Sequence, residues 1–467
     1  MLVIALFVVI AAAVGHAAIL APLRTPSNPD RIIPGRYIVR LKTPDNQPNE
    51  SVLAVAAMHV SWLEDQIGRD QFSENRLHHV YDVRPGYAGD FSEAMLQEIR
   101  RRPEVAYVEP DQVMHVVDEQ FLADLPETIM DWRDYLGLNG VGRPKARFQA
   151  SGKRIVRSKR LTNKIAPSTQ SKTTREQSNA PWGLRRLSNR QLFNKTTGEE
   201  ESKYIYPETA GEGVDVYVID TGINVRHKDF EGRAHWGKTI PMFDEDIDGN
   251  GHGTHCAGTI GGKIYGVAKR VQLFAVKVLM TSGFGTNSDV IKGVEWVIKR
   301  HYRNCRSKRR SVANMSLGGG KSQLLEEVIN LATELGVHFA VAAGNDNEDA
   351  CAYSPAGAKG PVTVGAVDIK DNMAFFSNYG RCVDLFAPGV DITSAWIGSR
   401  YAKRTISGTS MASPHVAGVL ALYLGEKDYT PSQLKRVLVR HSRKNVISAI
   451  PDGSMTVNRL VCIDHLL

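Results

Sequence analysis

Between residues 35 and 117, apolar positions switch repeatedly between strand-like and helix-like spacing. Stretches rich in β-branched and aromatic residues predict strands, and stretches with apolar residues three and four apart predict amphipathic helices. The predicted strands are "GRYIVRLK", "HHVYDV", "GYAGDFS" and "VAYVEPDQVMHVV", and the predicted helices are "SVLAVAAMHVSWLEDQIG" and "EAMLQEIRRRPE". The resulting β-α-β-β-α-β order predicts a small ferredoxin-like (α+β) domain over residues 35–117.

A different pattern begins at Ala180. Runs that are apolar throughout alternate with helical stretches, among them "VDVYVIDTG", "VQLFAVKVL", "VANMSLGG", "VHFAVAAGN" and "VTVGAV". Continuously apolar strands are typical of a parallel sheet that helices cover on both faces. We therefore predict an α/β domain over residues 180–467.

Residues 118–179 separate these two patterns and show little periodicity. The chain carries a formal net charge of +8, yet Val141 to Arg175 holds eleven Lys and Arg residues and no acidic residue. Subtracting, 8 − 11 leaves −3 for the rest of the chain. The basic excess is therefore local, and we interpret it as a solvated linker with no nucleic-acid partner.

The N-terminal residues predict entry into the secretory pathway. Residues 1–18 combine an apolar run with small residues near Ala17 and Ala18, as in a cleaved signal peptide. No later run is long enough to predict a membrane span. In that compartment Asn49 and Asn194 are candidate glycan acceptors, and the five cysteines can form disulfide bonds.

Three separated stretches carry candidate chemistry. "YVIDTG" places Asp220 at the end of an apolar strand, "GNGHGTHCAGT" places His252 at a predicted helix start, and "ISGTSMASPHVAG" contains Ser410. Functional groups of an open α/β sheet gather beyond the carboxyl ends of its strands, so these three side chains can converge there. A serine needs a base such as imidazole to take its proton, and a buried carboxylate orients that imidazole.

These motifs resemble the three signature blocks of the subtilisin-like serine proteases, and the match covers Ala180 to Leu467. The forms "HGTHC" and "AAGN" are similar to the proteinase K branch, and "DAC..SPA" with "NYGRCVD" is most similar to the fungal vacuolar proteinase B (cerevisin) group. The preceding "RYIVRLK" and "VAYVEPDQVMHV" resemble the inhibitor-type propeptide of such enzymes. The resemblance implies a subtilisin-like α/β fold and a serine endopeptidase that uses Asp220, His252 and Ser410.

The resemblance also implies an oxyanion site and a substrate cleft. Asn345, in "AAGN", is expected to donate a side-chain hydrogen bond to the oxyanion beside the Ser410 backbone N–H. The edges that pair with an extended substrate peptide, and the walls of its first specificity pocket, are expected at Gly283, Phe284, Gly285, Ser316, Leu317, Gly318, Ala342, Ala343 and Gly344. These stretches contain no acidic or basic residue, so we expect a broad preference for apolar or aromatic residues before the cleaved bond.

Two structural features follow from the same resemblance. Calcium is a candidate structural ion, held by the Asp384 carboxylate, the backbone carbonyls of Lys359 and Pro361, and waters, whereas catalysis needs no cofactor. A disulfide between Cys351 and Cys382 is expected. Cys305 and Cys462 are left without an assigned partner.

The propeptide is expected to act as an intramolecular inhibitor until it is removed. Its last strand, near Met114 to Val117, should lie in the cleft, and we expect self-cleavage after it. The dibasic pairs Lys153-Arg154 and Lys159-Arg160 are additional sites for a processing protease. We expect a monomer that degrades proteins and peptides in the vacuole, with the extracellular space as the alternative.

Pro414, in the "SGTSMASPHVAG" stretch, is expected near the first turn of its helix, where a missing backbone N–H matters least.

Two other functions are compatible with parts of the sequence. A catalytically silent protein of the same fold would use the cleft only for binding, but every residue the chemistry requires is present. An esterase of the α/β-hydrolase type would carry G-x-S-x-G, whereas Thr409 and Met411 flank Ser410 here.

Overall fold

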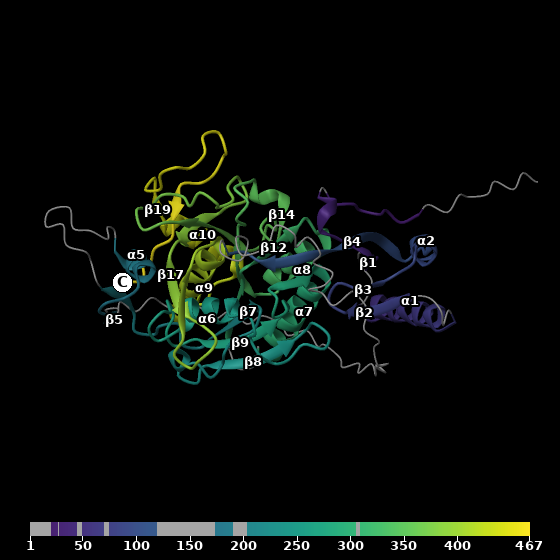
Figure 1. Cartoon of the computed structure of the whole chain (residues 1–467), viewed down its shortest axis with the longest axis horizontal. Coiled ribbons are helices and arrows are strands. Elements are labelled where there is room, and N and C mark those ends of the chain that lie inside the picture. The colour runs from purple at the N-terminus through teal and green to yellow at the C-terminus, as the bar shows by residue number, and fades with distance from the viewer. Residues whose placement is uncertain are drawn as a thin grey trace, which may run out of the picture. The chain divides into compact units, whose positions relative to one another are not determined.

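A computed structural model describes residues 20–26, 28–43, 49–69, 74–118, 173–189, 203–304 and 309–467 (Figure 1). The chain forms two compact units: Met1–Thr25 with Pro34–Pro110, and Pro26–Ile33 with Asp111–Leu467, each in its described part. The predicted signal peptide, Asn194, Cys305 and nearly all of the predicted linker lie outside the described residues, as does the side chain of Asn49.

The first unit has the ferredoxin-like element order that the sequence predicts. Its elements are β1 (Ile32–Leu41), α1 (Asn49–Arg69), β2 (Arg76–Tyr81), β3 (Gly86–Asp90), α2 (Glu93–Arg101) and β4 (Val105–Val116). The strands lie in the order β4-β1-β3-β2, and β3 is antiparallel to both β1 and β2. Apolar residues of both helices and of the strands form one buried core, which includes Leu63, Leu96, Ile99, Val39 and Tyr87.

A nine-stranded sheet organises the second unit, in the order β19-β20-β16-β15-β13-β11-β7-β9-β8. All neighbouring strands are parallel except β19, which is antiparallel to β20. The strands are β7 (Val214–Asp220), β8 (Ala234–Thr239), β9 (Gln272–Lys277), β11 (Arg310–Met315), β13 (His338–Ala342), β15 (Val362–Val367), β16 (Leu385–Pro388), β19 (Arg443–Lys444) and β20 (Arg459–Leu460). Every residue of β7, β13 and β15 is buried, as the continuous apolar pattern predicts.

Helices pack on both faces of this sheet, so the predicted α/β architecture with a covered parallel sheet is confirmed. On one face, α6 (His252–Gly261) and α9 (Thr409–Glu426) pack against each other and share a core with Val214, Val216 and Val218 (Figure 1). On the other face, α7 (Asn287–Asn304) lies close enough that a Cβ at Gly293 would be 2.4 Å from Val278. The side chains of β7 alternate between the faces, which is why one strand contacts both helix layers.

Short elements complete the second unit. They are η1 (Pro29–Arg31), β5 (Thr174–Gln177), α5 (Trp182–Ser188), β6 (Tyr204–Pro207), η2 (Lys228–Phe230), β10 (Phe284–Thr286), β12 (Leu317–Gly320), α8 (Gln323–Glu334), η4 (Ala350–Ala352), β14 (Tyr353–Ser354), β17 (Ile392–Ala395), β18 (Lys403–Ile406) and α10 (Pro431–His441). Two of them, β10 and β12, pair antiparallel with residues 113–116.

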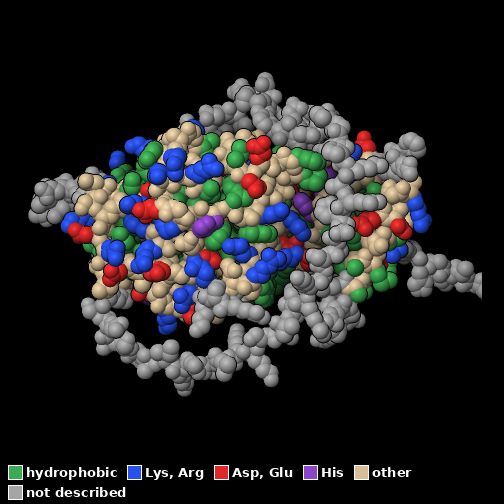
Figure 2. All heavy atoms as spheres, turned by 90° about the horizontal axis from the view of Figure 1, so that it is seen from below, with side chains coloured by type: hydrophobic (Ala, Val, Ile, Leu, Met, Phe, Trp, Pro, Cys, Tyr) green, Lys and Arg blue, Asp and Glu red, His purple; other side chains and the backbone are tan. Residues whose placement is uncertain are grey.

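The visible surface fits the view that the basic excess of the sequence is local. In Figure 2, Lys and Arg side chains are interspersed with Asp and Glu over the described part of this face. Across the described ranges, the helices are all too short or too polar to cross a bilayer.

Candidate active site

Asp220 and His252 form a buried ion pair at the carboxyl edge of the sheet. Asp220 is the last residue of β7 and His252 the first of α6, and the Asp220 Oδ1 to His252 Nδ1 distance is 2.8 Å. A second hydrogen bond, from the Thr221 backbone N–H, fixes Asp220 Oδ1 at 2.7 Å. The helix can come this close because position 253 is glycine, since a Cβ there would lie 2.2 Å from the carbonyl oxygen of Gly222.

Ser410 is the second residue of α9, close to the same pair. Its hydroxyl donates to the carbonyl of Ser316 at 3.0 Å, and the Cys256 thiol lies 3.5 Å from the Ser410 carbonyl and 4.0 Å from His252 Nδ1. Burial raises the pKa of Cys256, so this thiol stays protonated and can donate to the Ser410 carbonyl.

The prediction for Pro414 is wrong, because this residue lies inside α9, beyond the first turn. Proline has no N–H, so the carbonyl four residues earlier, at Ser410, loses its helical partner. The Ser316 hydroxyl replaces that partner at 2.8 Å. The helix therefore stays intact at Ser410, and the Ser316 hydroxyl stabilises it there.

Asn345 is held in one orientation beside Ser410. Its Oδ1 accepts hydrogen bonds from the backbone N–H of Thr409 at 3.0 Å and from the Thr409 hydroxyl at 2.7 Å. The side-chain amide must then present its N–H group in the opposite direction. That N–H donates to the carbonyl oxygen of Val117 at 3.0 Å, and the Ser410 backbone N–H lies 3.3 Å from the same oxygen.

The C-terminal half of β4 supplies this carbonyl. Within the second unit, residues 113–116 pair antiparallel with β10 on one side and β12 on the other, with His115 opposite both Phe284 and Gly318. The Val116 N–H also bonds the carbonyl of Gly283 at 3.1 Å. At the other end of the segment, the buried Asp111 carboxylate accepts from the N–H and hydroxyl of Ser288, in the first turn of α7. The predicted cleft edges therefore bracket the end of the predicted propeptide strand.

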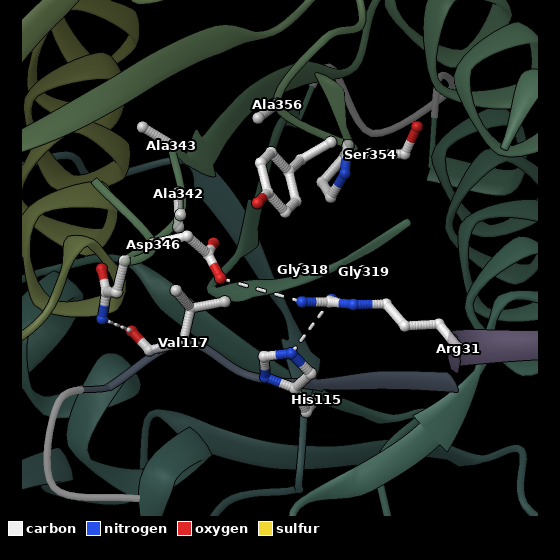
Figure 3. Close-up of a pocket in the computed structure, with 14 residues that line it drawn as sticks. Arg31, His115, Val117, Gly318, Gly319, Ala342, Ala343, Asp346, Ser354 and Ala356 are labelled. Carbon is white, nitrogen blue, oxygen red and sulfur yellow. Dashed lines mark hydrogen bonds and ion pairs between the residues drawn. The ribbon is translucent and has the colours of Figure 1, made fainter. Parts of the chain in front are cut away.

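A pocket opens beside Val117 (Figure 3). The predicted Gly318, Ala342, Ala343 and Gly344 line it, as does Gly319 of the predicted "SLGG" wall. The sequence reasoning missed other lining residues, among them Arg31, His115, Asp346, Tyr353 and Ala356. Figure 3 shows Arg31 between Asp346 and His115, at 3.8 Å and 3.2 Å. Burial, and then the charge of Arg31, lower the pKa of His115 to about 4, so this imidazole is neutral near pH 7.

The proton-transfer contact between serine and histidine is not made in this arrangement. Among the described residues His252 Nε2 has no hydrogen-bond partner, while the Ser410 hydroxyl faces Ser316 and accepts from the Val117 N–H at 3.2 Å. Burial alone lowers the pKa of His252, but the Asp220 carboxylate outweighs it and holds the pKa well above its ordinary value near 6.5.

The expected calcium ligands come together, but around a different cation. The ammonium of Lys435 lies 2.8 Å from Asp384 Oδ2, 3.2 Å from the carbonyl of Lys359 and 2.6 Å from that of Pro361. The residues present therefore do not fit a calcium ion, because a lysine of the same chain already fills the ligand set. The sequence reasoning missed Lys435, which reads locally as a solvent-facing residue of an amphipathic helix.

The predicted disulfide is confirmed, and one of the two unassigned cysteines can be placed. Cys351 and Cys382 form a disulfide, and Cys462 is a free, buried thiol. Asn314, the third Asn-x-Ser/Thr position, is fully buried in β11.

Comparisons with known proteins agree with this geometry. Residues 211–457 match the subtilase family, and residues 36–117 match the peptidase inhibitor I9 family. The chain is 44% identical to a subtilisin-like protease of Coccidioides posadasii, over 92% of this chain and 81% of that protein. It is 41% identical to alkaline protease 2 of Aspergillus fumigatus, over 94% of this chain and 82% of that one. A solved structure, of a cold-adapted subtilisin-like serine proteinase, is 47% identical with a TM-score of 0.55, and the match covers 61% of this chain and 98% of that one.

The chain therefore belongs to the subtilisin-like serine proteases, with an I9-type propeptide ahead of the peptidase fold. This family commonly holds structural calcium and uses no catalytic cofactor, and a lysine at the expected calcium ligands differs from that common arrangement.

Proposed function

We propose that this chain is the zymogen of a serine endopeptidase in which Ser410 is the nucleophile, His252 the general base and Asp220 the residue that orients it. Asn345 and the Ser410 backbone N–H form the oxyanion site. The observation that carries the proposal is the position of the Val117 carbonyl oxygen, 3.0 Å from Asn345 Nδ2 and 3.3 Å from the Ser410 nitrogen. This is where the carbonyl of a cleaved peptide bond has to lie.

The register of β4 in the cleft predicts which peptide bond is cut. Val117 occupies the position before the cleaved bond, so self-processing separates Val117 from Asp118. Position 408 supports this assignment, because a Cβ on Gly408 would lie 2.6 Å from the Val117 oxygen and 2.9 Å from Asp118 Cα. A side chain at 408 would therefore push the peptide out of the oxyanion site.

Catalysis then follows from the geometry. Rotation of the Ser410 side chain brings its hydroxyl to His252 Nε2, which takes the proton while Oγ bonds to the carbonyl carbon. The negative charge on the carbonyl oxygen is stabilised by the Asn345 and Ser410 N–H groups. His252 returns the proton to the departing amine, and water repeats the sequence to release the acyl group. Asp220 stabilises the imidazolium that exists between these steps.

Substrate preference follows from the pocket beside Val117. Its walls are small, Ala342, Ala343, Gly344 and Gly318, so they leave room for a side chain larger than valine. We propose a broad preference for apolar and aromatic residues at this position. The Asp346 carboxylate also lines the pocket, and in the zymogen its charge is paired with Arg31.

The finer placement of the enzyme rests on sequence resemblance. We propose that it belongs to the proteinase K branch, near the fungal vacuolar proteinase B group, and that it acts as a monomer in general protein degradation after transit through the secretory pathway. The vacuole is the proposed destination and the extracellular space the alternative. Imaging of a C-terminally tagged chain distinguishes the two, and N-terminal sequencing of the mature form shows whether the dibasic pairs are also cut.

Two experiments test the catalytic proposal. A fluorophosphonate probe should label Ser410 in the processed protein, and His252→Ala should abolish the labelling, whereas a silent binding protein would stay unlabelled in both forms. Mass spectrometry of the purified full chain should find a propeptide that ends at Val117. Normal processing of a Ser410→Ala chain, in cells that lack other vacuolar proteases, would show that another enzyme makes the cut.

A further inference from the structure

The ammonium group of Lys435 is fully hydrogen-bonded, at a site separate from the proposed catalytic residues. The ammonium group has three acceptors at 2.6 to 3.2 Å, one for each of its N–H donors. They are the carboxylate of Asp384 and the carbonyls of Lys359 and Pro361. A lysine ammonium has three N–H donors and no acceptor, so this set satisfies it completely. The side chain of Lys435 is only 23% exposed and that of Asp384 only 21%.

We propose that Lys435 is a built-in cation that replaces the structural calcium of the family, so that this peptidase fold is stabilised at Asp384 without a metal. A calcium ion would have to lie about 2.3–2.6 Å from the oxygens that the ammonium now contacts, and it needs six to eight oxygen ligands. Among the described residues, this site offers one carboxylate and two carbonyls, so waters would have to supply the remaining ligands. Lys435 cannot remain there beside the metal, because three positive charges would face the single charge of Asp384.

The position of Lys435 in the fold shows what this cation stabilises. It projects from α10, Lys359 and Pro361 belong to the loop that leads into β15, and Asp384 directly precedes β16. Asp384 Oδ2 also accepts from the Thr363 N–H at 2.9 Å, and the same loop is bound to α8 through Gly360 N–H and Asn330 Oδ1 at 2.8 Å. Lys435 therefore fastens the helix that follows α9 to two adjacent strands of the sheet.

The proposal predicts a protein whose stability does not respond to chelators at this site. The experiment uses the full chain with Ser410→Ala, which prevents self-digestion, and measures the thermal midpoint Tm in EDTA and in millimolar calcium. Lys435→Met keeps most of the side-chain length and removes the charge. Arg436→Met is the matched control, since Arg436 is the next residue of α10 and is exposed.

We expect the parent chain to keep its Tm in EDTA, and Lys435→Met to lower it by roughly 3–8 °C, as loss of charge-assisted hydrogen bonds does in a domain of this size. Arg436→Met should leave it unchanged. Because Lys435 and Asp384 act together, the double variant with Asp384→Asn should lose little more than either single variant. Millimolar calcium should restore part of the Tm of Lys435→Met, and Asp384→Asn should abolish that recovery.

Two results would overturn the proposal. One is a saturable calcium-dependent rise in the Tm of the parent chain that disappears with Asp384→Asn, which would show that the metal displaces the lysine. The other is a Lys435→Met variant whose Tm equals that of the Arg436→Met control. If Lys435→Met does not fold, the calcium titration of the parent chain still tests the proposal, because it shows whether the metal displaces the lysine.

Discussion

In the proposed active site, the oxyanion half and the proton-transfer half are in different states. On the oxyanion side, the Val117 carbonyl is engaged by Asn345 and by the Ser410 backbone, and Thr409 holds the Asn345 amide in register. On the proton-transfer side, Asp220 and His252 are paired, yet the Ser410 hydroxyl bonds the Ser316 carbonyl and leaves His252 Nε2 without a partner among the described residues.

Under the proposed function, this difference bears on how the propeptide strand binds in the cleft before it is cut. The oxyanion side is fixed by backbone groups and by hydrogen bonds that are already made, so it binds a peptide carbonyl at once. The proton-transfer side requires one side-chain rotation before His252 can accept a proton. Binding of the strand and attack on it are therefore separable, and substitutions should affect them differently.

Replacing Ser410 by alanine should produce the largest separation. We expect kcat to fall by about 10⁶-fold, because no nucleophile remains. The unmodified enzyme, added in trans, has to remove the propeptide of this variant first. The synthetic peptide of residues 111–117 should then bind to it within a few-fold of its affinity for the unmodified enzyme, because the bond from the Val117 N–H to the Ser410 hydroxyl is lost but the partners in β10, β12 and Asn345 are unchanged. Hydrolysis of a chromogenic peptide and a titration with the 111–117 peptide measure the two effects. A large loss of peptide affinity would mean that the two halves are not separable.

Asp220→Asn should affect only the proton-transfer side, with a fall in kcat of about 10⁴-fold. It should also move the pH profile. Because Asp220 raises the pKa of His252, and only neutral imidazole is a base, the acid limb of kcat/KM should lie above 6.5 in the unmodified enzyme. Loss of the carboxylate should shift that limb to lower pH. An acid limb that stays in place would contradict the assignment of Asp220 as the group that raises this pKa.

Asn345→Ala should weaken the oxyanion side. We expect kcat to fall by about 10²–10³-fold, equivalent to about 3–4 kcal/mol, with little change in KM, because the donor matters most when charge develops on the oxygen. The acid limb of the pH profile should not move, which distinguishes this variant from Asp220→Asn. A rise in KM at unchanged kcat would show that Asn345 contributes only to ground-state binding.

Thr409→Val should have the smallest effect. It removes the hydroxyl that donates to Asn345 at 2.7 Å and accepts from the Gly344 N–H at 3.2 Å, while the backbone N–H of residue 409 still orients Asn345. We expect a fall in kcat of about 10-fold, the size of one neutral hydrogen bond. Thr409→Ser restores the hydroxyl and should restore the rate. Failure of that rescue would assign the loss to packing rather than to the orientation of Asn345.

The local sequence was informative where a feature depends on neighbouring residues. The period of the apolar positions predicted both element orders, because burial of a strand or a helix face imposes that period directly. The motifs around Asp220, His252 and Ser410 were recognisable because each residue needs a specific local backbone, such as the close approach that only Gly253 permits. These parts of the fold and site could be predicted without coordinates.

What the sequence could not determine depends on residues that meet only after folding. Lys435 lies 51 residues after Asp384, and nothing in "PSQLKRVL" indicates that its ammonium enters the set of oxygens attributed to calcium. The register that places Val117, rather than its neighbours, at Asn345 depends on the pairing of residues 113–116 with both β10 and β12. The role of Ser316 at the carbonyl freed by Pro414 is of the same kind. The sequence thus determined which chemical groups are present and which elements carry them, whereas tertiary packing decided their partners, because hydrogen bonds and ion pairs depend on distances of a few ångströms that spacing along the chain does not define.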